Sequence, residues 1–146
     1  MKRRAFIAAL GGAAAWPMVA RAQQPERMRR IGILNPLAAD DSEQRARISA
    51  FQQALQQLGW TEDRNVRFDY RSSAGDAADT RKYATEMVAL LPDVILTNGA
   101  AGVAPLLETT RRVPVVFVLV ADPVGAGFVN SLAHPGGNAT GFIAIE

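Results

Sequence analysis

The chain has 146 residues, with 16 Lys and Arg, 14 Asp and Glu and a formal charge of +2; this length suits one domain with a hydrophobic core. It contains no cysteine, which excludes a disulfide framework and a lipid-anchored Cys. Because it also has a single histidine, a transition-metal site is not expected.

The first 22 residues have the three parts of a signal peptide. A basic start contains Arg3 and Arg4, a short Gly- and Ala-rich apolar stretch follows, and the small residues Ala20 and Ala22 form a peptidase site. The arginine pair, followed closely by Phe6, resembles the bacterial twin-arginine export signal. We therefore predict cleavage after Ala22 and an exported, soluble, periplasmic product. The alternative is a buried or membrane-anchoring helix, which the paired glycines and the proline disfavour.

Removal of this leader changes the charge of the protein. Four of the 16 basic residues and none of the 14 acidic ones precede Gln23, so the product has 12 basic and 14 acidic residues and a formal charge of −2. The basic excess belongs to the leader and does not indicate nucleic-acid binding. Residues 23–30, which still contain three arginines, are expected to form a solvated linker.

The next elements follow in chain order. Residues 31–35 are a short apolar run, typical of a strand buried on both faces. A helix is predicted over 41–58, because apolar residues recur every three or four positions from Ile48 to Leu58. Acidic and serine residues at 40–42 are candidate N-caps for this helix.

Two further strand–helix pairs follow. Residues 66–70 alternate strictly, which predicts a strand near the edge of the sheet. A helix is predicted over 76–91, a third strand over 93–98 and a third helix over 99–111, with basic residues at its C-terminal end.

The last elements complete the pattern. Residues 114–120 are the most apolar strand and should be central. A short helix is expected around 127–132 and a last strand over 140–145. This alternation predicts an α/β fold of three layers, a flavodoxin-like parallel sheet of five strands with helices on both faces.

In such a sheet, ligands bind at the carboxyl ends of the strands. The candidate ligand-binding residues at these ends are Asn35, Thr97, Asn98, Gly99, Ala100 and Asp122. Gly99 and Ala100 would present backbone N–H groups at a helix N-terminus, which suits a carboxylate, and Asp122 could pair with an ammonium group. Asn98 and Asp122 have a second interpretation as helix caps, and both interpretations remain open.

The sequence does not indicate an enzyme. It has no Gly-x-Gly-x-x-Gly after the first strand, no P-loop, no Gly-x-Ser-x-Gly and no His-Glu-x-x-His. His134 lies in a Pro- and Gly-rich segment and is interpreted as an exposed turn residue. We expect no catalytic residue, no metal and no cofactor.

Several stretches together resemble a bacterial family. They are the twin-arginine-like leader, Leu-Gly-Trp at 58–60, Pro-Val-Val-Phe-Val at 114–118, Ala-Asp-Pro-Val at 121–124 and Ser-Leu-Ala-His-Pro-Gly-Gly-Asn-Ala-Thr-Gly at 131–141. This pattern resembles the substrate-binding proteins of ABC transporters, in particular the tryptophan- and tyrosine-binding type. His134 stands where Arg is frequent in that family.

The resemblance implies a type I periplasmic binding protein, in which two α/β lobes close on a small solute such as an amino acid and deliver it to a permease. The six candidate residues would line one half of the cleft, and the Pro-Gly-Gly-Asn turn at 135–138 would shape the approach to the hinge. Residues 31–146 correspond to the N-terminal lobe alone. We therefore expect a truncated receptor that binds solute weakly by itself and has an exposed, association-prone hinge-side surface.

Two alternatives remain beside the receptor lobe. One is an exported single-lobe protein that acts as a sensor or through protein contacts, and the other is an exported flavodoxin-like enzyme. The fold alone does not choose among the three.

Overall fold

The computed structural model describes residues 27–143. The strands are β1 (Arg29–Asn35), β2 (Val66–Ser72), β3 (Val94–Asn98), β4 (Val115–Val120) and β5 (Ala139–Ile143), and the helices are α3 (Ser42–Gln57), α4 (Ala77–Ala89) and α5 (Gly99–Thr109). The predicted signal peptide, with Arg3, Arg4, Ala20 and Ala22, lies outside the described residues. β1 begins within the predicted linker, and the end of the predicted last strand, 144–145, is not described.

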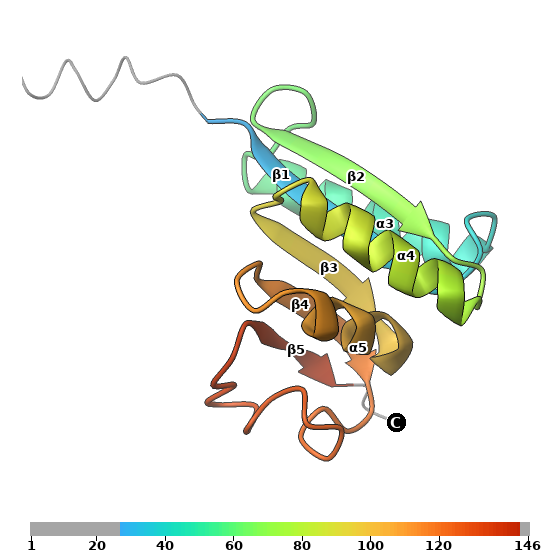
Figure 1. Ribbon diagram of the computed structural model, residues 1–146. Helices are drawn as coiled ribbons and strands as arrows, with labels where there is room; N and C mark the ends of the chain where they lie inside the picture. Colours follow the sequence, from blue (N-terminus) through green and yellow to red (C-terminus); the bar gives the residue numbers. More distant parts are fainter. Residues whose placement is uncertain (1–26, 144–146) are drawn as a thin grey trace, which may run out of the picture.

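All five strands pair in parallel, in the order β2-β1-β3-β4-β5 (Figure 1). This confirms the predicted α/β sheet and the position of β2 at an edge. The most apolar strand, β4, was expected at the centre, but β3 is the middle strand. β4 is apolar because it lies between two strands and packs against α5. Val115 and Phe117 of this strand are fully buried.

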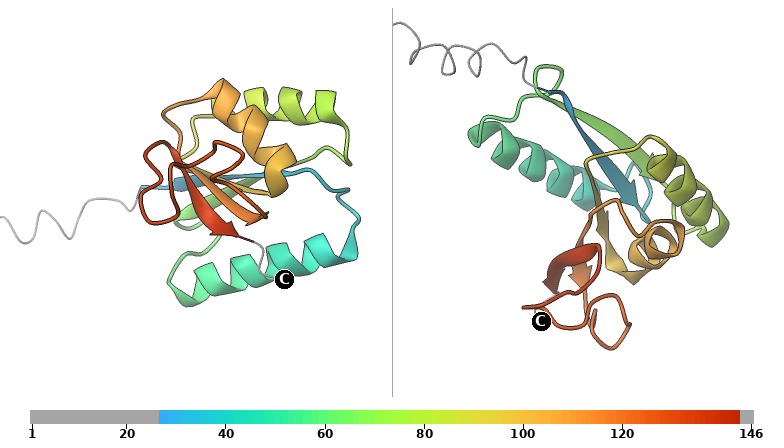
Figure 2. Two further views of the ribbon diagram at one scale, coloured as in Figure 1. Left: turned by 90° about the horizontal axis from the view of Figure 1, so that it is seen from below. Right: turned by 60° about the vertical axis from the view of Figure 1, so that its left-hand side comes forward.

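The helices form two unequal layers on the sheet. Figure 2 shows α3 alone on one face and α4 with α5 on the other. This arrangement follows from right-handed crossovers, because the chain moves from β1 to β2 in one direction and then back across the sheet to β3 and β4.

The α4/α5 face holds the closely packed core. Leu34, Ile95, Phe117, Val103 and Leu106 have no exposed surface on this side. The opposite face is less covered. Gln44 is the only buried residue of α3, and Leu58, which was predicted on its apolar face, is the C-cap residue and is 76% exposed.

Side-chain caps start two of the helices. Asp41 Oδ1 accepts a hydrogen bond from the backbone N–H of Gln44 at 2.8 Å, and Asp76 Oδ1 accepts one from Asp79 at 2.8 Å. Each bond satisfies a backbone donor that has no partner within the helix. The predicted N-cap of α3 is thus confirmed.

The expected helix around 127–132 is not formed. A single turn starts earlier, where the N–H of Ala126 donates to the carbonyl of Asp122, and it ends at Gly127, which has a φ of 75°. A positive φ at Gly127 stops helical propagation, so the segment continues as turns. α5 also ends earlier than predicted, which leaves Arg111 and Arg112 beyond its C-terminus.

Candidate functional site

The carboxyl ends of β1 and β3 flank the point where the strand order reverses. β2 lies on one side of β1, while β3, which comes later in the chain, lies on the other side. The chain leaves these two strands toward helices on opposite faces, α3 after β1 and α5 after β3 (Figure 2). Such a switch point is the usual ligand site of an open parallel sheet.

Asn35 ends β1 with its side chain almost fully enclosed. It is 2% exposed, and its Oδ1 accepts a hydrogen bond from the N–H of Leu37 at 3.0 Å, which holds the exit loop in place. Its Nδ2 has no hydrogen-bond partner. An unpaired buried amide group costs free energy. The end of β1 therefore contains a buried donor that the protein does not satisfy.

Thr97 has a structural role within the sheet. Its hydroxyl donates to the carbonyl of Leu34 at 2.8 Å, and the residue is 2% exposed. A Cβ added at Gly102 would stand 2.0 Å from Thr97 Oγ1, so the hydroxyl lies against the first turns of α5. The structure thus separates Thr97 from Asn98, because successive residues of a strand point to opposite faces.

Asn98, Gly99 and Ala100 form the start of α5. Gly99 has a φ of 66°, a conformation that favours glycine, and Ala100 is exposed. The first turn contains no acidic residue, and Asn98 makes no side-chain capping bond, unlike Asp41 and Asp76 in the other two helices. The N–H groups and the positive dipole end of α5 are therefore not neutralised by side chains of this helix.

Gln44 is a site residue that the sequence analysis missed. It is 7% exposed in the first turn of α3, and its Oε1 accepts a hydrogen bond from Asn98 Nδ2 at 3.1 Å. The signal was available, because Gln44 precedes Ile48 by four residues and so lies on the apolar face of the predicted helix.

Asp122 follows β4 and is exposed. Its Oδ1 accepts a hydrogen bond from the N–H of Gly125 at 2.7 Å, so it stabilises the single turn that follows. The strand before it is irregular: Leu119 has a φ of 58°, and the pairing with β5 shifts register between Phe117 and Val120. Asp122 therefore caps this turn and not the helix that was expected to follow. Its other carboxylate oxygen, Oδ2, has no hydrogen bond among the described residues.

A hollow of about 400 Å³ lies on the α3 face beside these residues. Gln44, Arg47 and Asn98 contribute its polar lining. Its other lining residues are mostly apolar, namely Ile33, Leu34, Ile48, Ala50, Phe51, Leu96, Val118 and Leu119, with Thr97 completing the set. An apolar hollow with a few polar groups at one side is typical of a site for a small molecule.

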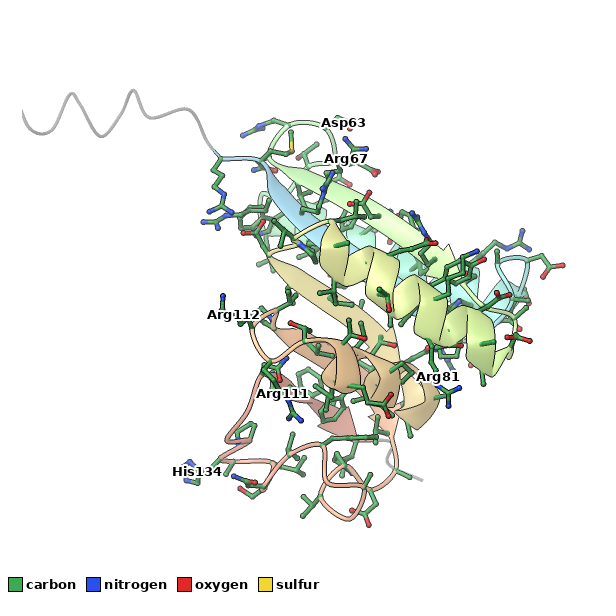
Figure 3. All side chains as sticks on the ribbon, viewed as in Figure 1. Asp63, Arg67, Arg81, Arg111, Arg112 and His134 are labelled. Carbon is green, nitrogen blue, oxygen red and sulfur yellow. The ribbon has the colours of Figure 1, made fainter. Side chains whose placement is uncertain are left out.

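His134 and the two arginines that follow α5 lie away from this end of the sheet (Figure 3). Figure 3 shows His134 on the loop before β5, and Arg111 and Arg112 on the loop between α5 and β4. Asn138, the last residue of the predicted Pro-Gly-Gly-Asn turn, donates to the carbonyls of Thr110 and Val113, so this turn lies beside the start of β4.

Within residues 27–143, no group of three or more His, Cys, Asp or Glu side chains could hold a metal ion. In that same range, no helix is both long enough and apolar enough to cross a bilayer. Among the described residues, two groups have clearly shifted pKa values: burial raises the pKa of Tyr70, and hydrogen bonding lowers the pKa of Asp93.

Comparisons with known proteins agree with this geometry. Residues 30–144 match the family described as ABC transporter substrate binding protein. The chain is 31% identical over 91 residues to the tyrosine-binding protein of Clostridioides difficile, a match that covers 62% of this chain and 26% of that protein.

Solved structures give the same result. The ABC domain in complex with L-Trp from Streptococcus pneumoniae matches with a TM-score of 0.72 and 27% identity, over 79% of this chain and 38% of that one. A ligand-free, open substrate-binding protein with adhesive properties from Clostridium difficile matches with a TM-score of 0.71 and 26% identity, over 77% and 38%. The chain thus spans well under half the length of these relatives, and it belongs to the ABC transporter substrate-binding protein family.

Proposed function

We propose that this chain forms one wall of the solute-binding cleft of an ABC transporter receptor, and that the solute carries a carboxylate, as an amino acid does. The observation that carries the proposal is the N-terminus of α5. It opens at the switch point without a side-chain cap or an acidic residue, where Gly99 and Ala100 leave room for close approach. Free N–H groups and a positive helix end bind carboxylates.

Two further features at the carboxyl end of the sheet fit the rest of an amino acid. Asp122 offers a carboxylate to an ammonium group, and the apolar hollow beside Asn98 suits an apolar or aromatic side chain. The relatives named for tyrosine and for L-Trp support an aromatic amino acid as the first solute to test.

We further propose that the receptor is exported through the predicted leader and delivers its solute to a membrane permease. The leader and the family support this proposal.

The edge of the sheet formed by β5 is exposed and apolar. β5 has no charged residue, and its Phe142 and Ile143 are 71% and 38% exposed. In the two-lobed receptors that this chain resembles, a second lobe is available to cover such an edge. We propose that this edge contacts a second lobe, and that it associates with other surfaces when that lobe is absent.

A single wall leaves a bound solute open to water, so the chain alone should bind weakly. Calorimetric titration with L-amino acids should give dissociation constants weaker than about 1 mM, or no measurable heat. Micromolar affinity for this chain alone would contradict the single-wall account.

A substitution in the first turn of α5 tests the position of the carboxylate. Ala100→Asp places a negative charge at the second helical position of α5, where it should repel the solute and weaken binding about tenfold in an NMR titration. Ala78→Asp is the matched control, because it makes the same change at the second helical position of α4. Equal affinity in both variants would place the carboxylate elsewhere.

A further inference from the structure

Asn98 differs from the other two N-cap residues in where its side chain goes. Asp41 and Asp76 each bond the backbone N–H three residues ahead, in the first turn of their own helix. The equivalent donor in α5 is the N–H of Ala101, and Asn98 does not bond it. Asn is among the best N-cap residues, so a contact that competes for its side chain would account for the missing bond.

Gln44 is in place to do this. Its Oε1 accepts a hydrogen bond from Asn98 Nδ2 at 3.1 Å, across the gap between α3 and the end of β3. Gln44 is itself fixed, because it is 7% exposed and its backbone N–H is bonded to Asp41. The contact therefore joins the Asn98 side chain to the first turn of α3.

A second observation comes from β1. Leu34 pairs with Thr97, so Asn35 and Asn98 follow as neighbours on parallel strands, with side chains on the same face. Asn35 is 98% enclosed and has an unpaired donor, Nδ2, while Asn98 has an unpaired buried acceptor, Oδ1. These neighbouring groups are complementary, and neither is used to close the first turn of α5.

We propose that Gln44 is a positioning residue of the solute site, which holds the Asn98 side chain off α5 and so keeps the N–H of Ala101 open to a carboxylate. The role of Gln44 in solute binding rests on the proposed function. The effect of the Gln44–Asn98 contact on the N–H of Ala101 can be tested without solute. When Gln44 cannot accept a hydrogen bond, Asn98 turns back and caps Ala101, and a solute must then displace the cap.

Amide hydrogen exchange measured by NMR on the full chain tests the proposal. In Gln44→Leu, the N–H of Ala101 should exchange about fivefold more slowly than in the natural protein, the effect of one added cap. Gln44→Glu keeps an acceptor for Asn98 and should leave the exchange rate of Ala101 unchanged. Gln57→Leu makes the same change at an exposed position of α3 and is the control for altered hydrophobicity.

Two variants of Asn98 test the same contact from the β3 side. Asn98→Asp removes the donor to Gln44, so the new carboxylate should cap Ala101 and slow its exchange even with Gln44 intact. In an Asn98→Ala background, Gln44→Leu should have no further effect on Ala101. An unchanged rate in both Gln44→Leu and Asn98→Asp would overturn the proposal, and this outcome would leave the solute-binding proposal to be judged by titration.

Discussion

The two ends of the sheet differ in how completely their buried or partly buried polar side chains are hydrogen-bonded. At the amino end, Asp93 accepts hydrogen bonds from the side chains of Arg27 and Arg29, each at 3.1 Å, and from the backbone N–H of Arg30 at 2.8 Å. At the carboxyl end, Asn35 and Asn98 each keep a buried amide atom without a partner. Polar groups that bond one another contribute to stability, whereas a buried polar group without a partner costs free energy.

A third buried atom without a hydrogen bond does not change this contrast. It is Asp69 Oδ2, which lies 2.9 Å from Arg30 Nε and forms an ion pair whose alignment does not meet hydrogen-bond geometry. Its charge is therefore compensated within the protein. Among the described residues, the uncompensated buried polar atoms are at the carboxyl end.

The largest stability effect is expected at the amino end. Asp93→Asn keeps an acceptor for Arg30 but loses the charge, and it should lower the free energy of unfolding at pH 7 by about 1 kcal/mol. The hydrogen bond from the backbone N–H of Arg30 has the largest effect on the pKa of Asp93 and lowers it below its usual 3.8 in the folded protein. Burial, the next largest effect, opposes this shift, while the hydrogen bond from Arg29 and the charges of Arg27 and Arg29 lower the pKa further.

The pH dependence of this difference checks its cause. A carboxyl group with a lowered pKa contributes stability above its unfolded value, and that contribution is lost as the pH falls through the folded value. Urea unfolding should therefore show a constant difference between the natural protein and Asp93→Asn near neutral pH, shrinking below the usual 3.8. A difference that persists in acid would assign the effect to packing instead, and solute affinity should be unchanged by this variant at neutral pH.

A smaller effect of opposite sign is expected at the carboxyl end. Ala100→Asp adds the acidic residue that the first turn of α5 lacks, and it should stabilise the protein by about 0.5 kcal/mol. Ala78→Asp should do less, because α4 already begins with Asp76 and Asp79. Thermal unfolding measures both, and a loss of stability in Ala100→Asp would indicate that the α5 N-terminus is already compensated.

Most of the fold could be predicted from local sequence patterns. Alternation in β2 indicated an edge strand, and acidic residues before α3 indicated its start, because these signals depend on neighbours in sequence. The helix predicted around 127–132 is wrong, because the positive φ of Gly127 ends the single turn that forms.

The site was only partly predictable, for a physical reason. The strand ends that carry Asn35, Asn98 and Asp122 follow from the rule for parallel sheets. Whether each side chain is free depends on partners distant in sequence: Thr97 bonds Leu34, and Asn98 bonds Gln44, which is 54 residues away. No local pattern identifies such a partner.

The central claim is that the carboxyl end of the sheet, at the N-terminus of α5, receives the carboxylate of the solute. Amide chemical shifts of the full chain, recorded by NMR while L-tryptophan, L-tyrosine and other amino acids are added to millimolar concentration, test it most directly. The account predicts shifts concentrated at Ala100, Ala101 and the side-chain amide of Asn98, with none around Asp93. Shifts that cluster elsewhere would contradict it.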